Sequence, residues 1–545
     1  MGETLRRQDN AWWRGAAIYQ IYPRSFQDSD GSGVGDLKGV TRRLGHVASL
    51  GVDAIWLSPF FRSPMADMGY DVSDYRDVDP MFGTLADFDA LLAEAHRLGL
   101  KVIIDQVLSH TSQAHPWFVE SRSSRVNPKA DWYVWANPKP DGTPPNNWLS
   151  VFGGSAWEWD ARRMQYYLHN FLADQPDLNF HNPAVRDALL DAVRFWLERG
   201  VDGFRLDTVN YYFHGRSLAD NPPVERSDGL PPDSNPYLHQ QHLHDKTQPE
   251  NTAFLEGFRR LLDEYENRAS VGEVGDEGRS LATVATYTAG RDRLHMCYTF
   301  DMLGKEFSAL HVRRCIEDFA SHVADGWICW AFSNHDVARH VSRWVRPDGN
   351  VDAVARFSIA LLCALRGSIC LYQGEELGLP EAELRREDIR DPFGIRFWPA
   401  FKGRDGCRTP MVWEARAASG GFTTARPWLP MPDEHRALAV DVQEPDAASI
   451  LNFYRLMLAF RRAHPALLSG ELELLGADDH VLAFVRSRDE NVLFCAFNFS
   501  DAPATYVLPS RLAHLDGLEN VSRGYELRAG TLELAPLGVL FARMR

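Results

Sequence analysis

The sequence predicts an α/β protein in which a (β/α)8 TIM barrel carries an inserted lid domain after its third strand and an antiparallel β-sandwich domain at its C-terminus. Two observations predict this class. Eight short apolar runs end abruptly in polar or aromatic residues, and helical patterns follow many of them. After about residue 465 the pattern changes to short alternating strands. Strands that alternate with helices form a parallel sheet, and eight such units can close into a barrel.

The eight apolar runs supply the expected barrel strands. Helices are expected near residues 85–98 and 184–200, where apolar residues recur every three or four positions. The active site of such a barrel lies at the C-terminal ends of its strands, so the residues that end the runs are candidates for function. In chain order the runs are AAIYQIYPRSF, DAIWLSPFF, KVIIDQVLSH, GFRLDTVN, ASVGEV, LHMCYTFD, ICWAFSNHD and SICLYQGEE.

Uneven spacing between the runs predicts the domain boundaries. The barrel is expected to span residues 1–110 and 180–465. The segment 111–179, rich in Trp, Asn, Pro and Gly, is the expected lid domain. A second insertion, at about 375–430, follows the eighth run, and the C-terminal β domain takes residues 466–545. Long loops on a catalytic face usually shape the substrate pocket.

Composition excludes several classes of partner. The 545 residues carry a formal net charge of −16, which argues against nucleic acid or an anionic membrane surface. No stretch has the length of a membrane span or the pattern of a signal peptide. The seven cysteines are odd in number and lack zinc-ligand spacing, which indicates reduced thiols. We therefore expect a cytoplasmic enzyme with no nucleic acid and no membrane partner.

Three acids end three of the expected strands. Asp207 ends the fourth and Glu273 the fifth, so the two are neighbours on the rim, and Asp336 faces them from the seventh. Glycoside cleavage uses two carboxyl groups, held about 5–5.5 Å apart in enzymes that retain the anomeric configuration. Arg205 lies on the same strand face as Asp207 and is expected to favour its ionised form. A single acid would more often be a cap or an ion pair, but three acids on three strand ends at one mouth predict a catalytic site.

The ordered motifs DQVLSH, QPDLN, GFRLD, GEV and FSNHD resemble those of glycoside hydrolase family thirteen, the α-amylase superfamily, in its α-glucosidase and oligo-1,6-glucosidase branch. The resemblance runs nearly end to end. It implies that Asp207 is the nucleophile, Glu273 the general acid/base and Asp336 the stabiliser of the transition state. The implied mechanism is a double displacement that retains the α anomer.

The same resemblance implies a pocket around one glucose. His110 and His335 fall where the family binds sugar hydroxyls. Asp67 and Tyr70, in ADMGYD, correspond to residues that bind the non-reducing end and stack on the ring. Arg404, in GRDGCRTP, is expected to pair with Asp67 and to close the pocket behind one glucose, which would make the enzyme exo-acting.

Phe152 and Phe171 are expected apolar walls of this pocket, with core packing as the alternative. Thr208 follows the nucleophile directly. In this branch Val at that position tends to accompany α-1,6 cleavage, and Thr or Ala tends to accompany α-1,4 cleavage, so the sequence favours the α-1,4 bond. The common Asn of the first motif is Ser109 here.

The segment DSDGSGVGD predicts a loop that can wrap a hard cation. Asp28, Asp30, Ser32, the Val34 carbonyl and Asp36 stand at alternating positions, and oxygen ligands at this spacing suit Ca2+ or Mg2+. The expectation is a structural ion, with no metal in catalysis and no organic cofactor. An acidic surface turn without an ion is the alternative.

The sequence therefore predicts a retaining, exo-acting α-glucosidase that releases terminal non-reducing α-1,4-linked glucose from short oligosaccharides or glucosides. A sugar or alcohol acceptor could take the glucosyl group in place of water. The nearest alternatives are an α-glucosyltransferase, a sucrose or maltose isomerase of the same branch, or an oligo-1,6-glucosidase. A non-catalytic relative or a carbohydrate-binding module would leave the three acids unexplained.

Overall fold

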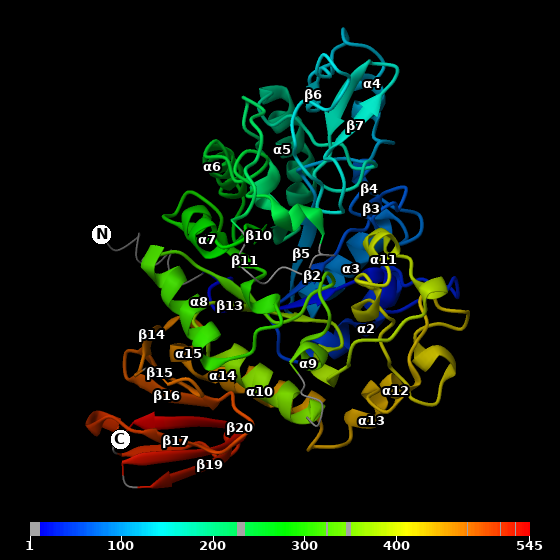
Figure 1. Cartoon of the computed structure of the whole chain (residues 1–545). Coiled ribbons are helices and arrows are strands. Elements are labelled where there is room, and N and C mark those ends of the chain that lie inside the picture. Colours follow the sequence, from blue (N-terminus) through cyan, green and yellow to red (C-terminus); the bar gives the residue numbers. More distant parts are fainter. Residues whose placement is uncertain are drawn as a thin grey trace.

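The structure is a computed structural model that describes residues 11–225, 235–322, 325–344, 350–476, 478–512, 514–528 and 530–544. Its centre is a parallel eight-stranded barrel (Figure 1). The strands are paired in the order β11-β10-β9-β5-β2-β1-β13-β12, and a parallel bridge between Cys297 and Ile328 joins the two ends of this order. The predicted limits at residues 1 and 545 lie outside the described residues. The barrel strands are β1 (Ala17–Ile21), β2 (Ala54–Leu57), β5 (Lys101–Gln106), β9 (Gly203–Leu206), β10 (Ala269–Val274), β11 (Met296–Thr299), β12 (Cys329–Ala331) and β13 (Ser368–Tyr372).

Helices follow the barrel strands and pack around them. Side-chain caps fix several of their starts: Asp36 accepts a hydrogen bond from the Gly39 N–H at the start of α2, and Thr84 forms a capping box with Asp87 at the start of α3. The helices of the outer layer are α2 (Leu37–Ser49), α3 (Leu85–Arg97), α5 (Pro183–Glu198), α6 (Asn251–Leu262), α7 (Ser280–Thr288), α8 (Ala309–His322), α10 (Val351–Ala364) and α14 (Ile450–Ala463).

Strand alternation separates two apolar layers. On β9, Phe204 and Leu206 pack outward in the core between the strands and the helices. Side chains of the opposite parity, such as Ile103 on β5 and Val271 on β10, fill the barrel interior. Successive side chains of a strand point to opposite faces. Arg205 and Glu273 therefore point into the barrel, as Ile103 and Val271 do. This orientation places both side chains at the barrel mouth.

The segment between β5 and β9 contains a small antiparallel sheet of order β6-β8-β7. It stands at one end of the molecule, above the mouth of the barrel (Figure 1). Its elements are α4 (Pro116–Ser121), β6 (Trp135–Ala136), β7 (Trp157–Asp160) and β8 (Gln165–Leu168), and a hairpin of β3 (Phe61–Arg62) and β4 (Asp74–Val78) precedes β5.

The C-terminal domain lies at the opposite end of the molecule (Figure 1). Its strands form one connected antiparallel sheet, because β20 pairs with strands of both halves of the domain. The chain turns within β20 at Leu537, whose φ is 52°. Apolar residues from both halves, including Leu532 and Leu540, then enclose a separate core. The strands are β14 (Glu471–Leu474), β15 (Val481–Arg488), β16 (Asn491–Asn498), β17 (Ala504–Val507), β18 (Leu515–Gly517), β19 (Arg523–Arg528) and β20 (Thr531–Met544).

The predicted fold class, a (β/α)8 barrel with a C-terminal β domain, is confirmed. After β13 the chain runs through short helices and turns before it reaches α14, and this insertion returns to the barrel mouth with Arg404. Among the described helices, none combines the length and the apolar character that crossing a membrane requires. The remaining short helices are α9 (His340–Arg343), α11 (Pro392–Phe397), α12 (Asp433–Arg436), α13 (Val440–Gln443) and α15 (Pro465–Ser469).

Candidate active site

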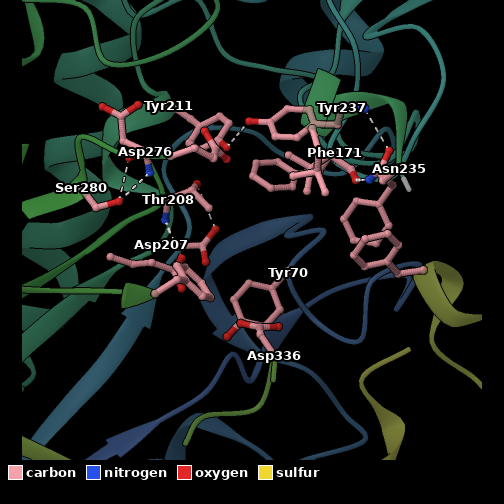
Figure 2. A pocket seen from close by; sticks show the side chains of 18 of the residues that line it. Tyr70, Phe171, Asp207, Thr208, Tyr211, Asn235, Tyr237, Asp276, Ser280 and Asp336 are labelled. Atoms are coloured by element: carbon pink, nitrogen blue, oxygen red, sulfur yellow. Dashed lines mark hydrogen bonds between the residues drawn. The ribbon is translucent and has the colours of Figure 1, made fainter. Parts of the chain in front are cut away.

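A cavity of about 540 Å³ opens at the C-terminal ends of the barrel strands (Figure 2). Ten of the twelve residues predicted for catalysis or substrate binding line it. The two others, Arg205 and His335, lie behind its wall with side chains 1% exposed. The ten are Asp67, Tyr70, His110, Phe152, Phe171, Asp207, Thr208, Glu273, Asp336 and Arg404.

Arg205 joins the two neighbouring acids. Its Nη1 donates to Oδ1 of Asp207 at 2.5 Å, and its Nη2 lies 2.5 Å from Oε1 of Glu273. Nη1 also donates to Asp105 at 2.9 Å, and the Tyr298 hydroxyl donates to Glu273 at 2.6 Å. One guanidinium thus contacts three buried carboxyl groups. Its Nη1 binds Asp207 and its Nη2 binds Glu273.

Burial controls the protonation of this cluster. It raises the pKa of Asp207 to about 7, although Arg205 acts in the opposite direction. It likewise raises the pKa of Glu273 to about 7. Arg205 favours the ionised form of Asp207, as expected, but desolvation is the larger effect and one cation is shared among three acids, so the pKa of Asp207 is raised overall. Burial thus raises the pKa of both coupled acids toward neutral pH, where protonated and ionised forms of the pair are both accessible.

Thr208 connects the same two acids from the other side. Its backbone N–H donates to Oε2 of Glu273 at 3.0 Å, and its hydroxyl donates to Oδ2 of Asp207 at 3.3 Å. The hydroxyl also lies 3.0 Å from Oγ of Ser109. The residue has a left-handed backbone, with φ 40° and ψ 49°, which is strained for a β-branched side chain. This strained turn aims both the N–H and the hydroxyl at the acids.

Asp336 has a strongly cationic environment. Arg404 and Arg408 each donate to its Oδ1 at 3.1 Å, and Nε2 of His335 lies 3.2 Å from its Oδ2. Burial alone would raise the pKa of Asp336, but His335 and the two arginines lower it well below the usual range of a carboxyl group. Asp336 therefore stays ionised, whereas burial raises the pKa of Asp207 and Glu273 toward neutral pH.

Arg404 pairs with Asp67 at the cavity wall, as the sequence predicts. Its Nη2 donates to Asp67 at 2.7 Å and to Asp391 at 2.8 Å. Asp391 is fully buried, so it anchors the guanidinium from behind while Asp67 and Arg404 both face the cavity. The Arg404 guanidinium also lies over the Phe152 ring, 5.2 Å from its centroid.

Tyr70 and His110 line the cavity, and His335 lies behind Tyr70. The Tyr70 ring stacks on His335, with centroids 5.2 Å apart and planes 5° apart, and its hydroxyl donates to Asp105 at 3.1 Å. Nε2 of His110 lies 3.1 Å from the amide nitrogen of Gln175, and burial lowers the pKa of this imidazole to about 4. The His110 imidazole is therefore neutral at physiological pH and can donate a hydrogen bond or accept one.

Aromatic rings form one side of the cavity. Phe171 contacts His110 at 5.3 Å and Tyr211 at 5.2 Å between centroids, and Phe152 contacts Phe393 at 5.1 Å. Both predicted phenylalanines thus line the cavity and are also packed against neighbouring rings.

Several residues of the site were missed from the sequence. Asp105 and Gln175 stand inside the quoted motifs DQVLSH and QPDLN, which was a usable signal. Phe300 and Asp301 end the sixth run, LHMCYTFD, which was also a usable signal. Residues of irregular segments gave no such signal, because no strand or helix pattern places them. The missed residues of the cavity wall include Tyr211, Asn235, Tyr237, Leu238, Asp276, Glu277, Ser280, Phe300, Asp301 and Phe393.

The predicted cation loop brings its acids together. Ligand oxygens of Asp28, Asp30 and Asp36 lie within 4.8 Å of one another. The Ser32 hydroxyl lies 3.1 Å from the Val34 carbonyl oxygen. Burial acts to raise the pKa of Asp28, but hydrogen bonds from the Thr423 hydroxyl and from backbone N–H groups lower it, so the carboxylate is ionised. The chemistry of this donor set, oxygens with at least one ionised carboxylate, fits a hard cation.

Comparison with known proteins agrees with this geometry. The sequence model of the family described as "Alpha amylase, catalytic domain" matches residues 20–470. A probable alpha-glucosidase of Rhizobium meliloti (strain 1021) is 59% identical over 552 residues, covering 100% of both chains. An oligo-1,6-glucosidase of Heyndrickxia coagulans is 38% identical and covers 91% of this chain and 94% of its own.

Solved structures give the same result. The alpha-glucosyl transfer enzyme XgtA has a TM-score of 0.95 and 56% identity, covering 98% of this chain and 100% of its own. The trehalulose synthase MutB of Pseudomonas mesoacidophila MX-45 has a TM-score of 0.87 and 32% identity, covering 98% and 99%. A MutB variant was solved with its substrate sucrose. The chain therefore belongs to the α-amylase superfamily, glycoside hydrolase family thirteen, and within it to the branch of the α-glucosidases and the related glucosyl-transferring enzymes.

Proposed function

We propose that this enzyme is a retaining, exo-acting α-glucosidase that releases terminal non-reducing α-1,4-linked glucose from short oligosaccharides or glucosides. The observation that carries the proposal is the pair of acids, Asp207 and Glu273, on adjacent nitrogens of Arg205 beside the ionised Asp336. Glycosidases that invert the anomer hold their two carboxyl groups about 6.5–9.5 Å apart to admit a water, whereas retaining enzymes use the closer spacing. A shared guanidinium supports the closer spacing.

In the first step, a carboxylate oxygen of Asp207 attacks the anomeric carbon of the bound glucose. The bond from that carbon to the departing oxygen breaks, and Glu273 gives its proton to this oxygen. Positive charge develops on the sugar ring as the bond breaks, and the ionised Asp336 is placed to stabilise it. The product of the step is a glucosyl ester of Asp207 and a free alcohol.

In the second step, Glu273 takes a proton from a water molecule whose oxygen attacks the anomeric carbon. The ester bond to Asp207 breaks, glucose leaves with the α configuration, and both acids return to their starting protonation. A sugar or alcohol hydroxyl can replace the water, and glucose is then transferred to it. The 56% identity to the alpha-glucosyl transfer enzyme XgtA favours this transfer as a second activity.

Two further features support the finer assignment. The ion pair between Asp67 and Arg404 faces the cavity, where it would block a sugar chain beyond its terminal residue, which supports exo action. Thr208 brings a hydroxyl beside the bond to be broken, which supports a preference for the α-1,4 linkage. An oligo-1,6-glucosidase or an isomerase of the same branch is the alternative, favoured by the relatives of those names.

We also propose a structural Ca2+ or Mg2+ in the loop of Asp28, Asp30, Ser32, Val34 and Asp36. A bound cation would neutralise converging carboxylates and stabilise the start of α2, since Asp36 also caps that helix. All seven cysteines are unpaired thiols, which supports a reducing compartment, the cytoplasm.

Parallel incubation with maltose, isomaltose and sucrose, followed by proton NMR of the products and their anomers, tests the function. We expect fast release of α-glucose from maltose and slow release from isomaltose. Preferred cleavage of isomaltose would overturn the linkage assignment, and β-glucose as first product would overturn the retaining mechanism. New disaccharides in excess of glucose would make the enzyme mainly a transferase or isomerase.

A further inference from the structure

Lys246 lies directly behind the cavity wall and contacts four groups that form it. Its ammonium donates to the hydroxyls of Tyr237 at 2.9 Å and Tyr211 at 3.2 Å, to the carbonyl oxygen of Gly275 at 3.0 Å and to Oε2 of Glu277 at 2.8 Å. All four partners line the cavity, and the Lys246 side chain itself is 0% exposed. The lysine therefore shapes the wall without touching what binds inside.

A buried ammonium is costly unless it is paired and hydrogen-bonded, and here the structure supplies that compensation. Burial alone would lower the pKa of Lys246, but Tyr211 and Glu277 raise it well above its ordinary value, so the side chain is charged. The ammonium also lies over the two tyrosine rings, 5.0 and 5.4 Å from their centroids. Four acceptors around one cation fix the position of the wall segments that carry them.

The charge also fixes how the two phenols are oriented. An ammonium has three N–H donors and no acceptor, so its four contacts share three hydrogens and neither phenol can donate to Lys246. The Tyr211 and Tyr237 hydroxyls lie 2.7 Å apart, so one of them donates to the other (Figure 2). The hydrogen of the remaining hydroxyl has no protein acceptor among the described residues. It belongs to a residue of the cavity wall and can therefore be donated to an oxygen of a bound molecule.

These phenols stand on the side of the acids away from Tyr70 and Asp336 (Figure 2). The glucose-binding residues Asp67 and Arg404 occupy the closed end, with Asp336 beside them. A glucose bound there would direct its anomeric oxygen past Asp207 and Glu273 toward the two tyrosines. The phenols thus belong to the region of the departing alcohol and of the acceptor.

We propose that Lys246 is a positioning residue for the leaving group and the acceptor. It holds Tyr211 and Tyr237 so that one phenol donates a hydrogen bond to a hydroxyl oxygen of the sugar or alcohol bound beyond the acids. This inference rests on the proposed glucosidase function and adds to it the group that recognises the second half of the substrate.

Lys246 also braces the segment that follows the acid/base residue. Gly275, whose carbonyl it contacts, stands two positions after Glu273, and Asn210 donates to the same carbonyl at 3.0 Å. Asn210 also accepts from the Gly275 N–H at 3.3 Å. Because Asn210 holds this segment independently, removal of Lys246 is expected to disturb the tyrosines more than Glu273.

The test compares two donors with the variant Lys246→Met, which keeps the length of the side chain and removes its charge. Maltose places a glucose beyond the acids, whereas α-glucosyl fluoride places only a small ion there. We expect kcat/KM for maltose to fall about tenfold or more, because a buried hydrogen-bond network loses its donor. On α-glucosyl fluoride, kcat/KM is expected to stay within about threefold. Transfer to added glucose as acceptor should fall relative to hydrolysis.

Lys38→Met is the matched control. Lys38 is 64% exposed, and it forms an ion pair with Asp87, which does not line the cavity. It should leave both donors unchanged. Tyr237→Phe, which keeps the ring and removes the hydroxyl, should reproduce the difference between the donors even if Lys246→Met folds poorly. The double variant Lys246→Met/Tyr237→Phe should be no worse on maltose than Lys246→Met alone.

Equal losses on the two donors in both single variants would mean a merely structural role and would overturn this inference. Unchanged activity on maltose in both variants would overturn it as well. Neither result would affect the proposed function, which is tested separately by the products that the parent enzyme forms from maltose, isomaltose and sucrose.

Discussion

Arg404 donates a hydrogen bond to Asp67 at 2.7 Å although 337 positions separate the two residues along the chain. Asp67 comes from the segment after β2, and Arg404 comes from the insertion after β13. Their ion pair joins the first and last quarters of the barrel at its mouth. The proposed exo action rests on this ion pair, which would block the extension of a sugar chain past its non-reducing end.

The first prediction concerns this ion pair. The variant Asp67→Asn should lower kcat/KM for maltose by about 10- to 100-fold, because a hydrogen bond to a charged group contributes about 1.5–3 kcal/mol. Steady-state kinetics on maltose measures the loss. Asp74→Asn, an exposed carboxylate on β4, is the control and should be unaffected. Cleavage by the parent enzyme of a maltooligosaccharide blocked at its non-reducing end would contradict exo action itself.

The second prediction concerns the proton donor. Glu273→Gln should lower kcat on maltose by at least about 10²- to 10⁴-fold, the usual contribution of a general acid or base. Maltose binding, measured by calorimetry, should change little, because glutamine keeps the size of the side chain and can still accept from the Thr208 N–H.

Glu264→Gln is the control, because Glu264 is exposed and forms its ion pair with Arg194 at the surface. Turnover that survives in Glu273→Gln would show that another residue is the acid/base. Loss of maltose binding together with turnover would instead indicate that the variant has lost the site as a whole.

The third prediction concerns pH and stability. Burial raises the pKa of Glu375 to about 8, far above its ordinary value, and places the group where Tyr372 donates only one backbone hydrogen bond to it. A carboxyl whose pKa is raised by folding stabilises the protein fully below its unfolded pKa, and this contribution is lost as pH rises through the folded pKa. The contribution of Glu375 to the free energy of unfolding should therefore decline between about pH 5 and pH 8, and the difference in unfolding temperature between the parent and a variant without this carboxyl isolates it.

Thermal unfolding across this range checks the decline. Glu375→Gln is neutral at every pH, so its unfolding temperature should fall less steeply than that of the parent. Glu383→Gln, at a carboxylate whose side chain is 80% exposed, should leave the slope unchanged. Identical slopes for the parent and Glu375→Gln would show that Glu375 is not the group that takes up the proton.

Strand periodicity explains how much of the site could be predicted. Residues of one parity on a barrel strand share one face, so Arg205 and Asp207 had to lie together, and Glu273 had to meet them at the next strand end. The same rule and the length of the intervening segments predicted the barrel and the C-terminal β domain. These features depend on local pattern, which a single sequence carries.

The rest depends on three-dimensional packing. Desolvation of Asp207 outweighs the charge of Arg205, and burial depth cannot be judged from the order of residues. Lys246 and Tyr237 lie in a segment whose apolar residues recur with neither the two-residue period of a strand nor the 3.6-residue period of a helix. The sequence pattern therefore does not predict that they lie beside Glu277. The bend within β20 at Leu537 was also missed, although Pro536 and Gly538 flank it and are typical of a turn, because the alternation of apolar residues on both sides suggested one continuous strand.

The fourth prediction concerns linkage. In Thr208→Val the side chain keeps its branched shape, so the left-handed backbone is no more strained, but the hydroxyl contacts with Asp207 and Ser109 are lost. The ratio of kcat/KM for maltose to that for isomaltose should fall about tenfold, the lower end of what one contact in a pocket achieves. Thr208→Ser keeps the hydroxyl and should keep the ratio. An unchanged ratio in Thr208→Val would locate the linkage preference elsewhere in the cavity.

The last prediction concerns the cation loop. Carboxylate oxygens of Asp28, Asp30 and Asp36 converge within 4.8 Å, and Asp36 also caps α2, so a bound cation would stabilise both the loop and the helix. A ligand at 100 times its Kd stabilises the native state by about 2.7 kcal/mol. Dialysis against a chelator should therefore lower the unfolding temperature by several degrees, and Ca2+ or Mg2+ should restore it.

The variant Asp30→Asn removes one carboxylate of the loop. Asp30 is exposed and its carboxylate accepts only from the Ser32 N–H, so the variant should lose little stability of its own. Its unfolding temperature should no longer respond to the chelator. An unfolding temperature that is indifferent to chelator in the parent, with no metal found by elemental analysis, would establish the loop as an acidic turn held by its own hydrogen bonds.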